Sequence, residues 1–201
     1  MNNKITIDGR VISADDNPYI IAEMSANHNG NIENAYKIIH SAKAMGADAV
    51  KLQTYTADTL TLDSRLPDFM IDDGLWAGRS LYELYKEAYT PWDWHKPLFD
   101  CARDTGITIF SSPFDSTAVD FLEDLNAPAY KIASFEAIDL ALIKYVAATM
   151  KPMIISTGMA NQYEIQEAID TAKSAGCVEL AILHCVSGYP APSENYNLRT
   201  I

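Results

Sequence analysis

The sequence predicts a parallel α/β fold, because short apolar segments alternate with amphipathic helical segments along the whole chain. The predicted strands share a short, largely apolar composition that is typical of parallel strands buried on both faces; they are residues 19–25, 49–55, 107–113, 129–134, 153–158 and 180–184. Alternation of this density occurs in (β/α)8 barrels and in open, doubly wound sheets, and the pattern alone leaves both open.

Helices are predicted between the strands. From residue 31 to residue 45 the apolar residues recur at helical spacing, and Gly46 follows as a C-terminal stop. Thr90 is predicted to cap the next helix, which would have Pro91 at its first position and run to residue 106. Asn161 caps a further apolar stripe. Two shorter helices are predicted at residues 116–125 and 140–150.

A long insertion separates the second and third predicted strands, at residues 56–106. Insertions of this length after a strand are usually functional or form a lid. The segment holds a cluster of aromatic residues, namely Trp76, Tyr82, Tyr85, Tyr89, Trp92 and Trp94. Their simplest role is to pack the inserted helices, and the alternative is one wall of a sugar site, because sugar faces stack on aromatic rings.

Composition and charge exclude several classes of protein. Of the 201 residues 48% are hydrophobic and 21% are charged, which is ordinary for a globular domain, and no apolar run is long enough to span a bilayer. The N-terminus is polar, and the three cysteines are scattered and odd in number, which favours reduced thiols. A net charge of −12 disfavours nucleic acid. We therefore expect a cytoplasmic protein that binds neither nucleic acid nor a membrane.

Polar residues at the ends of apolar strands are the candidates for chemistry, because the carboxyl ends of barrel strands carry the active site. These residues are Glu23, Lys51, Gln53, Ser111, Ser112, Lys131, Ser134, Glu136, Ser156, Thr157, His184, Ser187 and Tyr189. Lys51 and Gln53 are two residues apart, so they share one face of their strand.

Two lysines inside apolar strands need partners, since a buried, unpaired ammonium is costly. Lys51 and Lys131 could simply pair with carboxylates such as Glu23 or Glu136. Together with the hydroxyl groups, the two lysines could instead form a cage for the phosphate and carboxylate groups of phosphoenolpyruvate. A third possibility is a Schiff-base aldolase, in which one of the lysines is the nucleophile.

His28, and Cys185 with its neighbour His184, are weaker candidates for chemistry. His28 follows a strand and is interpreted as a turn or supporting residue. Cys185 stands beside His184, but adjacent residues of a strand point to opposite faces, so we do not expect a catalytic thiol-imidazole pair.

Six segments of the chain, taken in order, resemble the sialic acid synthase (NeuB-like) family of phosphoenolpyruvate-dependent, sugar-condensing enzymes. They are IIAEMSANHNG, GADAVKLQTY, FSSPFD, PAYKIASFE, KPMIISTGM and LHCVSGYPAP. Within that family, TADTLTLDS and LYELYKEAYTPWDWH are most similar to the branch that makes pseudaminic acid. The N-acetylneuraminic acid and legionaminic acid branches differ mainly in this inserted region and remain the alternatives.

The resemblance implies a (β/α)8 TIM barrel, which this chain would carry as one incomplete domain over residues 1–201, truncated after about six strand-helix units. It implies the condensation of phosphoenolpyruvate with a 2,4-diacetamido-2,4,6-trideoxyhexose and the release of phosphate. It also implies a homodimer in the complete enzyme and a divalent metal, manganese or magnesium. The family's metal-binding motifs and its C-terminal antifreeze-like domain have no match before Ile201. No residue of this chain is therefore assigned to metal, and a non-catalytic binding fragment is a further hypothesis.

The resemblance also implies a role for each candidate residue. Glu23 handles the proton of an attacking water. The donor's phosphate and carboxylate groups are held by Lys51, Ser112, Lys131, Ser134 and Ser156. The sugar is faced by Gln53, Glu136 and Tyr189. Ser187 stands at a position where sialic acid synthases resemble one another in having an Asn. Its role as a sugar contact therefore departs from the family pattern.

Overall fold

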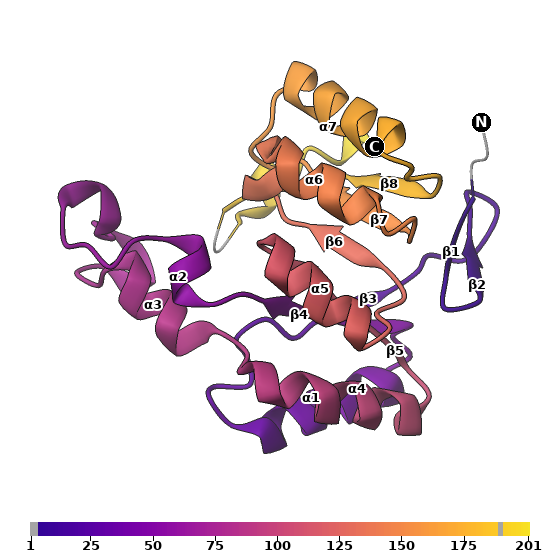
Figure 1. Ribbon diagram of the computed structural model, residues 1–201, viewed down its shortest axis with the longest axis horizontal. Coiled ribbons are helices and arrows are strands. Elements are labelled where there is room, and N and C mark those ends of the chain that lie inside the picture. Colours follow the sequence, from indigo (N-terminus) through magenta and orange to yellow (C-terminus); the bar gives the residue numbers. More distant parts are fainter. Residues whose placement is uncertain (1–3, 189–190) are drawn as a thin grey trace. The chain divides into compact units, whose positions relative to one another are not determined.

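The computed structural model describes residues 4–188 and 191–201. The chain forms two compact units: Tyr19–Leu125 form one, and Met1–Pro18 with Asn126–Ile201 form the other. Figure 1 shows the elements of both units, with the strands of each accompanied by helices.

The first unit, residues 19–125, is built on three parallel strands in the order β3-β4-β5. They are β3 (Ile21–Glu23), β4 (Ala49–Thr54) and β5 (Thr108–Pro113). The helices that follow them are α1 (Ile32–Ala44), α4 (Trp92–Thr105) and α5 (Ser116–Asp124). In the register of the strands Glu23 is paired with Lys51 and Gln53 with Ser112, so candidate residues of three strands meet at one end of the sheet.

The helix boundaries follow from local capping, with one correction to the sequence prediction. Asn31 caps α1 by accepting a hydrogen bond from the Glu33 backbone N–H, as its residue type favours. The prediction that Thr90 caps α4 is wrong: the helix starts at Trp92 and its N-cap is Pro91, which provides no side-chain cap. The Thr90 hydroxyl instead contacts His28 Nε2 at 3.3 Å, so a tertiary hydrogen bond has displaced the local one.

The insertion forms an arm of short helices, coloured purple to magenta in Figure 1. Its elements are α2 (Ala57–Leu60), η1 (Pro67–Phe69), η2 (Gly74–Trp76) and α3 (Leu81–Ala88). Ser80 and Glu83 form a capping box at the start of α3. Tyr85 packs edge-on against Tyr55 with ring centroids 5.9 Å apart, whereas Trp76 is 42% exposed. Packing therefore accounts for Tyr85 but not for Trp76.

The second unit contains three more parallel strands, in the order β6-β7-β8. They are β6 (Tyr130–Ile132), β7 (Met153–Ser156) and β8 (Leu180–Leu183). The helical elements of this unit are η3 (Phe135–Ile138), α6 (Leu140–Ala147), α7 (Gln162–Ser174), η4 (Ser193–Asn195) and η5 (Leu198–Thr200). An unpredicted antiparallel hairpin, β1 (Ile5–Ile7) with β2 (Arg10–Ile12), belongs to the same unit. The Thr6 backbone N–H ties it to Glu179 Oε1 at 2.8 Å.

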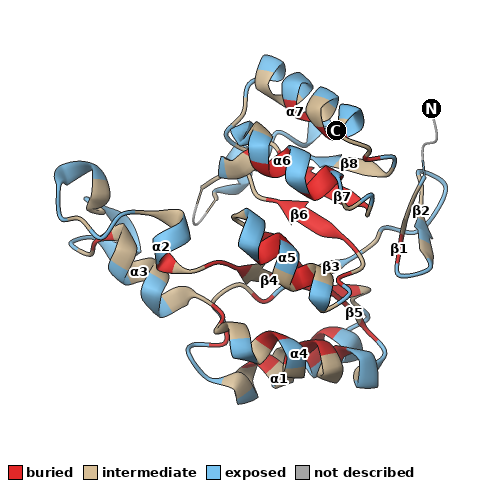
Figure 2. Ribbon diagram, in the orientation of Figure 1, coloured by how far each residue is buried: buried red, intermediate tan, exposed pale blue. Residues whose placement is uncertain are grey.

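All six predicted strands are present, and each pairs in parallel with a neighbour within its unit. This confirms the predicted parallel α/β fold of the (β/α)8 type. Strands β4 to β7 are almost wholly buried, and the helices bury one side only, which Figure 2 shows as red strands and mixed helices. This burial on both faces explains why the strands read as short apolar runs.

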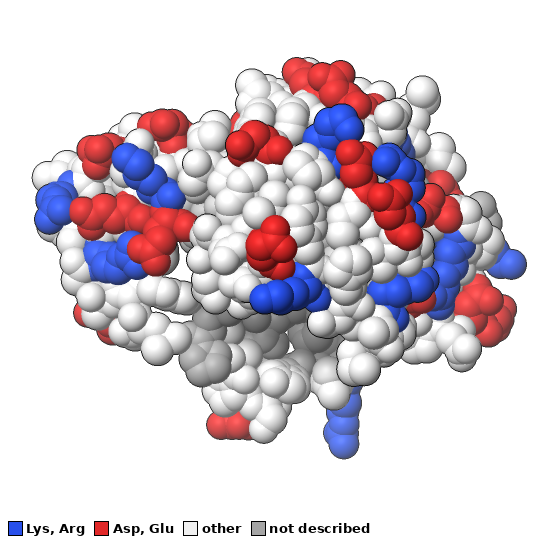
Figure 3. Space-filling view, turned by 90° about the horizontal axis from the view of Figure 1, so that it is seen from below, with Lys and Arg blue, Asp and Glu red and all other residues white. Residues whose placement is uncertain are grey.

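The surface carries both signs of charge. On the face seen in Figure 3, acidic and basic side chains lie close to one another. On the arm, Arg65 pairs with Glu83 and Arg79 with Glu87, each at 2.6 Å. Among the described residues, no helix is long and apolar enough to cross a membrane.

Candidate active site

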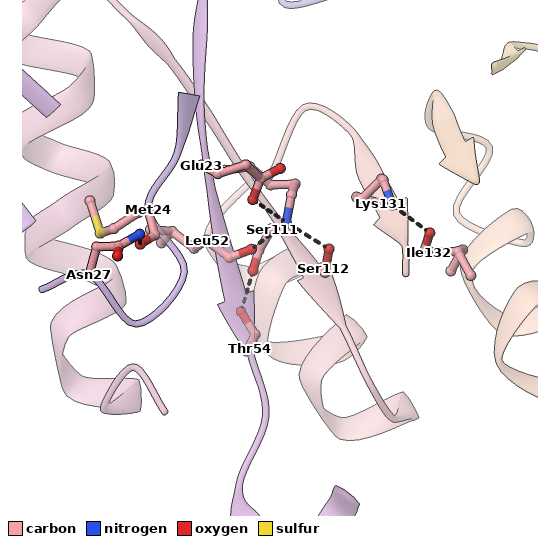
Figure 4. Close-up of polar contacts among 10 residues, drawn as sticks. Glu23, Met24, Asn27, Leu52, Thr54, Ser111, Ser112, Lys131 and Ile132 are labelled. Carbon is pink, nitrogen blue, oxygen red and sulfur yellow. Dashed lines mark hydrogen bonds and ion pairs between the residues drawn. The ribbon is translucent and has the colours of Figure 1, made fainter. Parts of the chain in front are cut away.

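The first cluster of candidate residues is centred on Lys51, in the unit formed by residues 19–125. The Lys51 ammonium lies 3.0 Å from the Glu23 carboxylate and 3.2 Å from the Ser112 hydroxyl (Figure 4). The Lys51 side chain is only 7% exposed, whereas that of Glu23 is 53% exposed. One buried cation is thus held between a carboxylate that reaches solvent and a hydroxyl, at the ends of three neighbouring strands.

This arrangement explains how an apolar strand accommodates Lys51. The predicted pairing with Glu23 is present, and the pair compensates the cost of burying the ammonium. Gln53 lies two residues further along the same face, is half-buried, and is in register with Ser112. Lys51, Gln53 and Ser112 therefore line one side of β4 and β5, as their spacing predicted.

A second polar group lies on the opposite face of the same two strands. Thr54 Oγ1 is 2.8 Å from His95 Nε2 and 2.6 Å from Ser111 Oγ, and all three residues are fully buried. The sequence analysis identified Ser111 as a strand-end residue but did not connect it to Thr54 or His95. These residues are far apart in the chain, so no sequence spacing indicated the connection.

Burial of His95 makes stability depend on pH. Burial lowers the pKa of His95 to about 4, compared with 6.5 for a free imidazole. The unfolded chain therefore takes up a proton below pH 6.5 that the folded chain resists. The stability linked to His95 is fully present above pH 6.5 and is lost as the pH falls toward 4, by up to about 3 kcal/mol.

We expect chemical denaturation curves to show this loss between pH 6.5 and pH 4.5. His95→Gln, whose amide oxygen can still accept a hydrogen bond but cannot titrate, should flatten the decline. A second buried histidine, His28, whose pKa burial also lowers, will leave a residual slope. Equal slopes in the wild type and in His95→Gln would show that His95 does not cause the effect.

His28 is a supporting residue, as the sequence suggested. It is fully buried, its Nδ1 accepts a hydrogen bond from the Gly30 backbone N–H at 3.1 Å, and its ring packs edge-on against Trp94. Because Nδ1 accepts, the neutral ring carries its proton on Nε2 and donates it to Thr90 Oγ1. His28 thereby holds the loop after β3 against the start of α4.

The second cluster of candidate residues lies in the other unit, at the ends of β6, β7 and β8. Ser134 Oγ accepts a hydrogen bond from the Gly158 backbone N–H at 3.3 Å and lies 3.4 Å from Cys185 Sγ. A Cβ atom built on Gly158 would lie 3.1 Å from both Ser134 Oγ and the Cys185 backbone oxygen, and it would overlap Ser187 Oγ. Ser134 and Ser187 therefore meet around Gly158, where a larger residue would force its neighbours to move.

Lys131 and Glu136 are the charged candidates of this unit. Lys131 is 7% exposed and its ammonium donates to the Ile132 backbone oxygen at 2.8 Å, a contact drawn in Figure 4. Burial raises the pKa of Glu136, and the charge of Lys131 partly offsets this rise. Oε2 of Glu136 is buried and has no hydrogen-bond partner among the described residues. A buried carboxyl oxygen without a protein partner is a candidate contact for a water or a ligand.

The predicted site residues divide between the two units. The first holds Glu23, Lys51, Gln53 and Ser112, and the second holds Lys131, Ser134, Glu136, Ser156 and Ser187. Ser156, at the end of β7, is buried. Tyr189 lies outside the described residues. The cage formed jointly by Lys51 and Lys131 stays a prediction.

The thiol-imidazole pair that the sequence analysis rejected does not form. His184 Nε2 contacts the Tyr196 backbone oxygen at 2.8 Å, whereas Cys185 contacts Ser134. Over residues 4–188 and 191–201, no group of three or more His, Cys, Asp or Glu side chains could hold a metal ion. The described residues thus do not fit the metal that the resemblance implies, and the chemistry that they offer is that of ammonium, carboxylate and hydroxyl groups.

Comparison with known proteins assigns the chain to a family. A model of the NeuB family matches residues 38–201, which is most of the chain. The chain belongs to the NeuB family. This confirms the family resemblance, and the matched region begins after Glu23 and the first of the six motifs.

Individual members of the NeuB family agree with this assignment. The chain is 49% identical to a pseudaminic acid synthase of Helicobacter pylori, over 90% of this chain and 53% of that protein. It is 47% identical to a pseudaminic acid synthase of Campylobacter jejuni, over 94% of this chain and 55% of that protein. The chain thus spans about half the length of the curated relatives that it matches.

A solved structure of the NeuB type has the same fold. The N-acetylneuraminic acid synthetase of Leptospira borgpetersenii, determined in complex with citrate, superposes with a TM-score of 0.86 at 26% identity. The match covers 98% of this chain and 64% of that one.

Proposed function

We propose that the full-length protein is a nonulosonic acid synthase that condenses phosphoenolpyruvate with a 2,4-diacetamido-2,4,6-trideoxyhexose to give pseudaminic acid and phosphate. The observation that carries the proposal is the buried Lys51 ammonium, held by Glu23 and Ser112 where β3, β4 and β5 end. The two relatives named pseudaminic acid synthase support the choice of product. N-acetylneuraminic acid and legionaminic acid are the alternative products.

The proposed reaction forms one carbon-carbon bond, and at C2 of the donor it forms a carbon-oxygen bond to water and breaks the carbon-oxygen bond to phosphate. The C3 atom of phosphoenolpyruvate attacks the aldehyde carbon of the open-chain sugar, and a water oxygen adds to C2. The tetrahedral intermediate then loses phosphate by cleavage of its C2–O bond, which leaves the 2-keto group of the product. Cationic side chains of the protein stabilise the negative charges of phosphoenolpyruvate throughout the reaction.

Each side chain has a proposed role. Lys51 and Lys131 bind the anionic groups of the donor, with hydroxyl groups from Ser112, Ser134 and Ser156. Glu23 takes the proton of the attacking water, a role that suits a carboxylate with half its surface exposed. Sugar contacts are assigned to Gln53, Glu136, Ser187 and Tyr189. The buried, unpartnered oxygen of Glu136 supports its assignment.

The Schiff-base alternative is less well supported at Lys51. A nucleophilic lysine must attack as the neutral amine. The Lys51 nitrogen lies 3.0 Å from the Glu23 carboxylate and 3.2 Å from the Ser112 hydroxyl, so it would have to leave these contacts to attack a carbonyl carbon. A divalent metal and a homodimer stay predictions of the family resemblance, and a cytoplasmic location stays a prediction from composition.

The test is an assay of phosphate release by the full-length protein, with phosphoenolpyruvate, the altrose-configured sugar and Mn²⁺ or Mg²⁺. Oxygen-18 placed in the bridge between C2 and phosphorus should appear in the released phosphate. The manno-configured diacetamido sugar and N-acetylmannosamine, used separately, discriminate between the three products. A lysine trapped by borohydride in the presence of pyruvate, without any phosphate release from phosphoenolpyruvate, would establish the aldolase instead.

A further inference from the structure

His95, Thr54 and Ser111 form a hydrogen-bond chain whose direction the structure determines. His95 Nδ1 lies 3.2 Å from the Pro91 backbone oxygen, which can only accept, so Nδ1 carries the proton of the neutral ring. His95 Nε2 must then accept, and the Thr54 hydroxyl donates to it at 2.8 Å. The single hydroxyl hydrogen of Thr54 is used in the bond to His95, so Ser111 donates to Thr54 at 2.6 Å. The chain runs from Ser111 through Thr54 and His95 to Pro91.

This hydrogen-bond chain lies on the opposite face of β4 and β5 from the first cluster. Ser111 immediately precedes Ser112, and Thr54 immediately follows Gln53, with Gln53 and Ser112 in register across β4 and β5. Side chains of adjacent strand residues point to opposite faces. The bond between Thr54 and Ser111 therefore ties the two strands together at the level where, on the other face, Ser112 Oγ contacts Lys51 Nζ at 3.2 Å.

The first turn of α4 packs against the end of β4 next to this hydrogen-bond chain. Besides His95, Trp92 donates its indole N–H to the Tyr55 backbone oxygen at 3.2 Å, one residue beyond the end of β4. His95 and Trp92 both pack against the ring of Phe121, with ring centroids at 5.3 and 4.8 Å. The imidazole therefore has one orientation, and the hydroxyl groups that depend on it are fixed as well.

We propose that Thr54 and His95 are positioning residues for the phosphoenolpyruvate site, acting through Ser111 on Ser112 and Lys51. They touch no reacting atom. Their role is to hold the strand ends so that the Ser112 hydroxyl and the Lys51 ammonium keep their spacing when the anionic donor binds. This inference rests on the proposed function, and it assigns a task to three buried polar side chains that an apolar core would not need.

The test is Thr54→Val in the full-length protein, because valine keeps the shape of threonine and removes the hydroxyl that makes both bonds. We expect the KM for phosphoenolpyruvate to rise about tenfold, the lower end of the loss seen when residues that orient metal ligands are replaced. The KM for the sugar should stay within about twofold. Thr54→Ser, which keeps the hydroxyl, should restore the KM for phosphoenolpyruvate.

Thr90→Val is the matched control. Thr90 is 1% exposed and its hydroxyl contacts another buried histidine, His28, at 3.3 Å, but it has no bond to β5 among the described residues. Thr90→Val should lower the melting temperature much as Thr54→Val does, while leaving the KM for phosphoenolpyruvate unchanged. An equal rise of this KM in both variants, or no rise in Thr54→Val, would overturn the positioning role.

A readout that needs no catalysis separates this inference from the proposed function. Proton exchange of the Lys51 NH₃⁺ group, observed by ¹⁵N-edited NMR, should be faster in Thr54→Val than in the wild type and unchanged in Thr90→Val. If the wild type releases no phosphate but Lys51 responds in this way, the proposed function is wrong and the positioning role stands. If Lys51 exchange is the same in all three proteins, the positioning role is wrong.

Discussion

Replacement of Lys51 by methionine should lower phosphoenolpyruvate-dependent phosphate release by about 10³-fold, the effect of removing a charged group that stabilises a transition state. Lys131→Met should have an effect of similar size. Methionine keeps most of the apolar length of lysine and removes only the ammonium. The measurement is steady-state phosphate release by the full-length protein, together with direct titration with phosphoenolpyruvate, whose affinity should fall in parallel.

The fold should survive Lys51→Met. The partner left behind, Glu23, is 53% exposed and can be hydrated, so the free energy of unfolding should change by about 1 kcal/mol or less. Lys96→Met is the matched control, because Lys96 is 73% exposed on α4 and pairs only with Asp100 among the described residues. Near-normal activity of Lys51→Met, with Lys96→Met also normal, would remove Lys51 from the site.

Gly158→Ala should lower activity about 100-fold, although it adds a single methyl group. The new Cβ would overlap Ser187 Oγ and approach Ser134 Oγ and the Cys185 backbone oxygen to 3.1 Å. The Ser187 hydroxyl would have to move away, and Ser134 and the Cys185 backbone would have to give slightly. Even small displacements of groups at the site lower the rate, and about 1 Å can cost about 100-fold. The overpacking should also destabilise the fold, by about 1–3 kcal/mol.

Gly46→Ala separates the two effects of a glycine substitution. Gly46 has a φ of +85° and open space around its Cβ position, so alanine there strains the backbone and touches nothing. It should cost about 1 kcal/mol of stability and leave phosphate release unchanged. If Gly158→Ala lost no more activity than Gly46→Ala at equal stability, the segment around Ser134 and Ser187 would not belong to the site.

Local patterns predicted most of the secondary structure, and of the two errors one has a local cause and the other a long-range cause. The N-terminal hairpin was missed although Asp8-Gly9, with φ values of 49° and 79°, is a strong hairpin signal between alternating apolar residues. The cap at Thr90 was wrong because its hydroxyl bonds to His28, which lies 62 residues away in the chain.

The sequence by itself determined the class of the fold, the family, and the strand-end residues that are candidates for chemistry. Strand and helix periodicity and the motif order are properties of consecutive residues, so they can be read without coordinates. The pairing of Lys51 with Glu23 was also foreseen, as one of two options, because a buried ammonium requires a partner.

Only the tertiary structure decided which side chains support that site. The chain from Ser111 to His95 joins residues 57 and 41 positions apart, and the crowding at Gly158 involves residues from three strand ends. Neither leaves a periodic trace in the sequence, because contacts between distant residues depend on strand register and helix packing. Those are fixed when the whole unit folds and buried polar groups must find their partners in space.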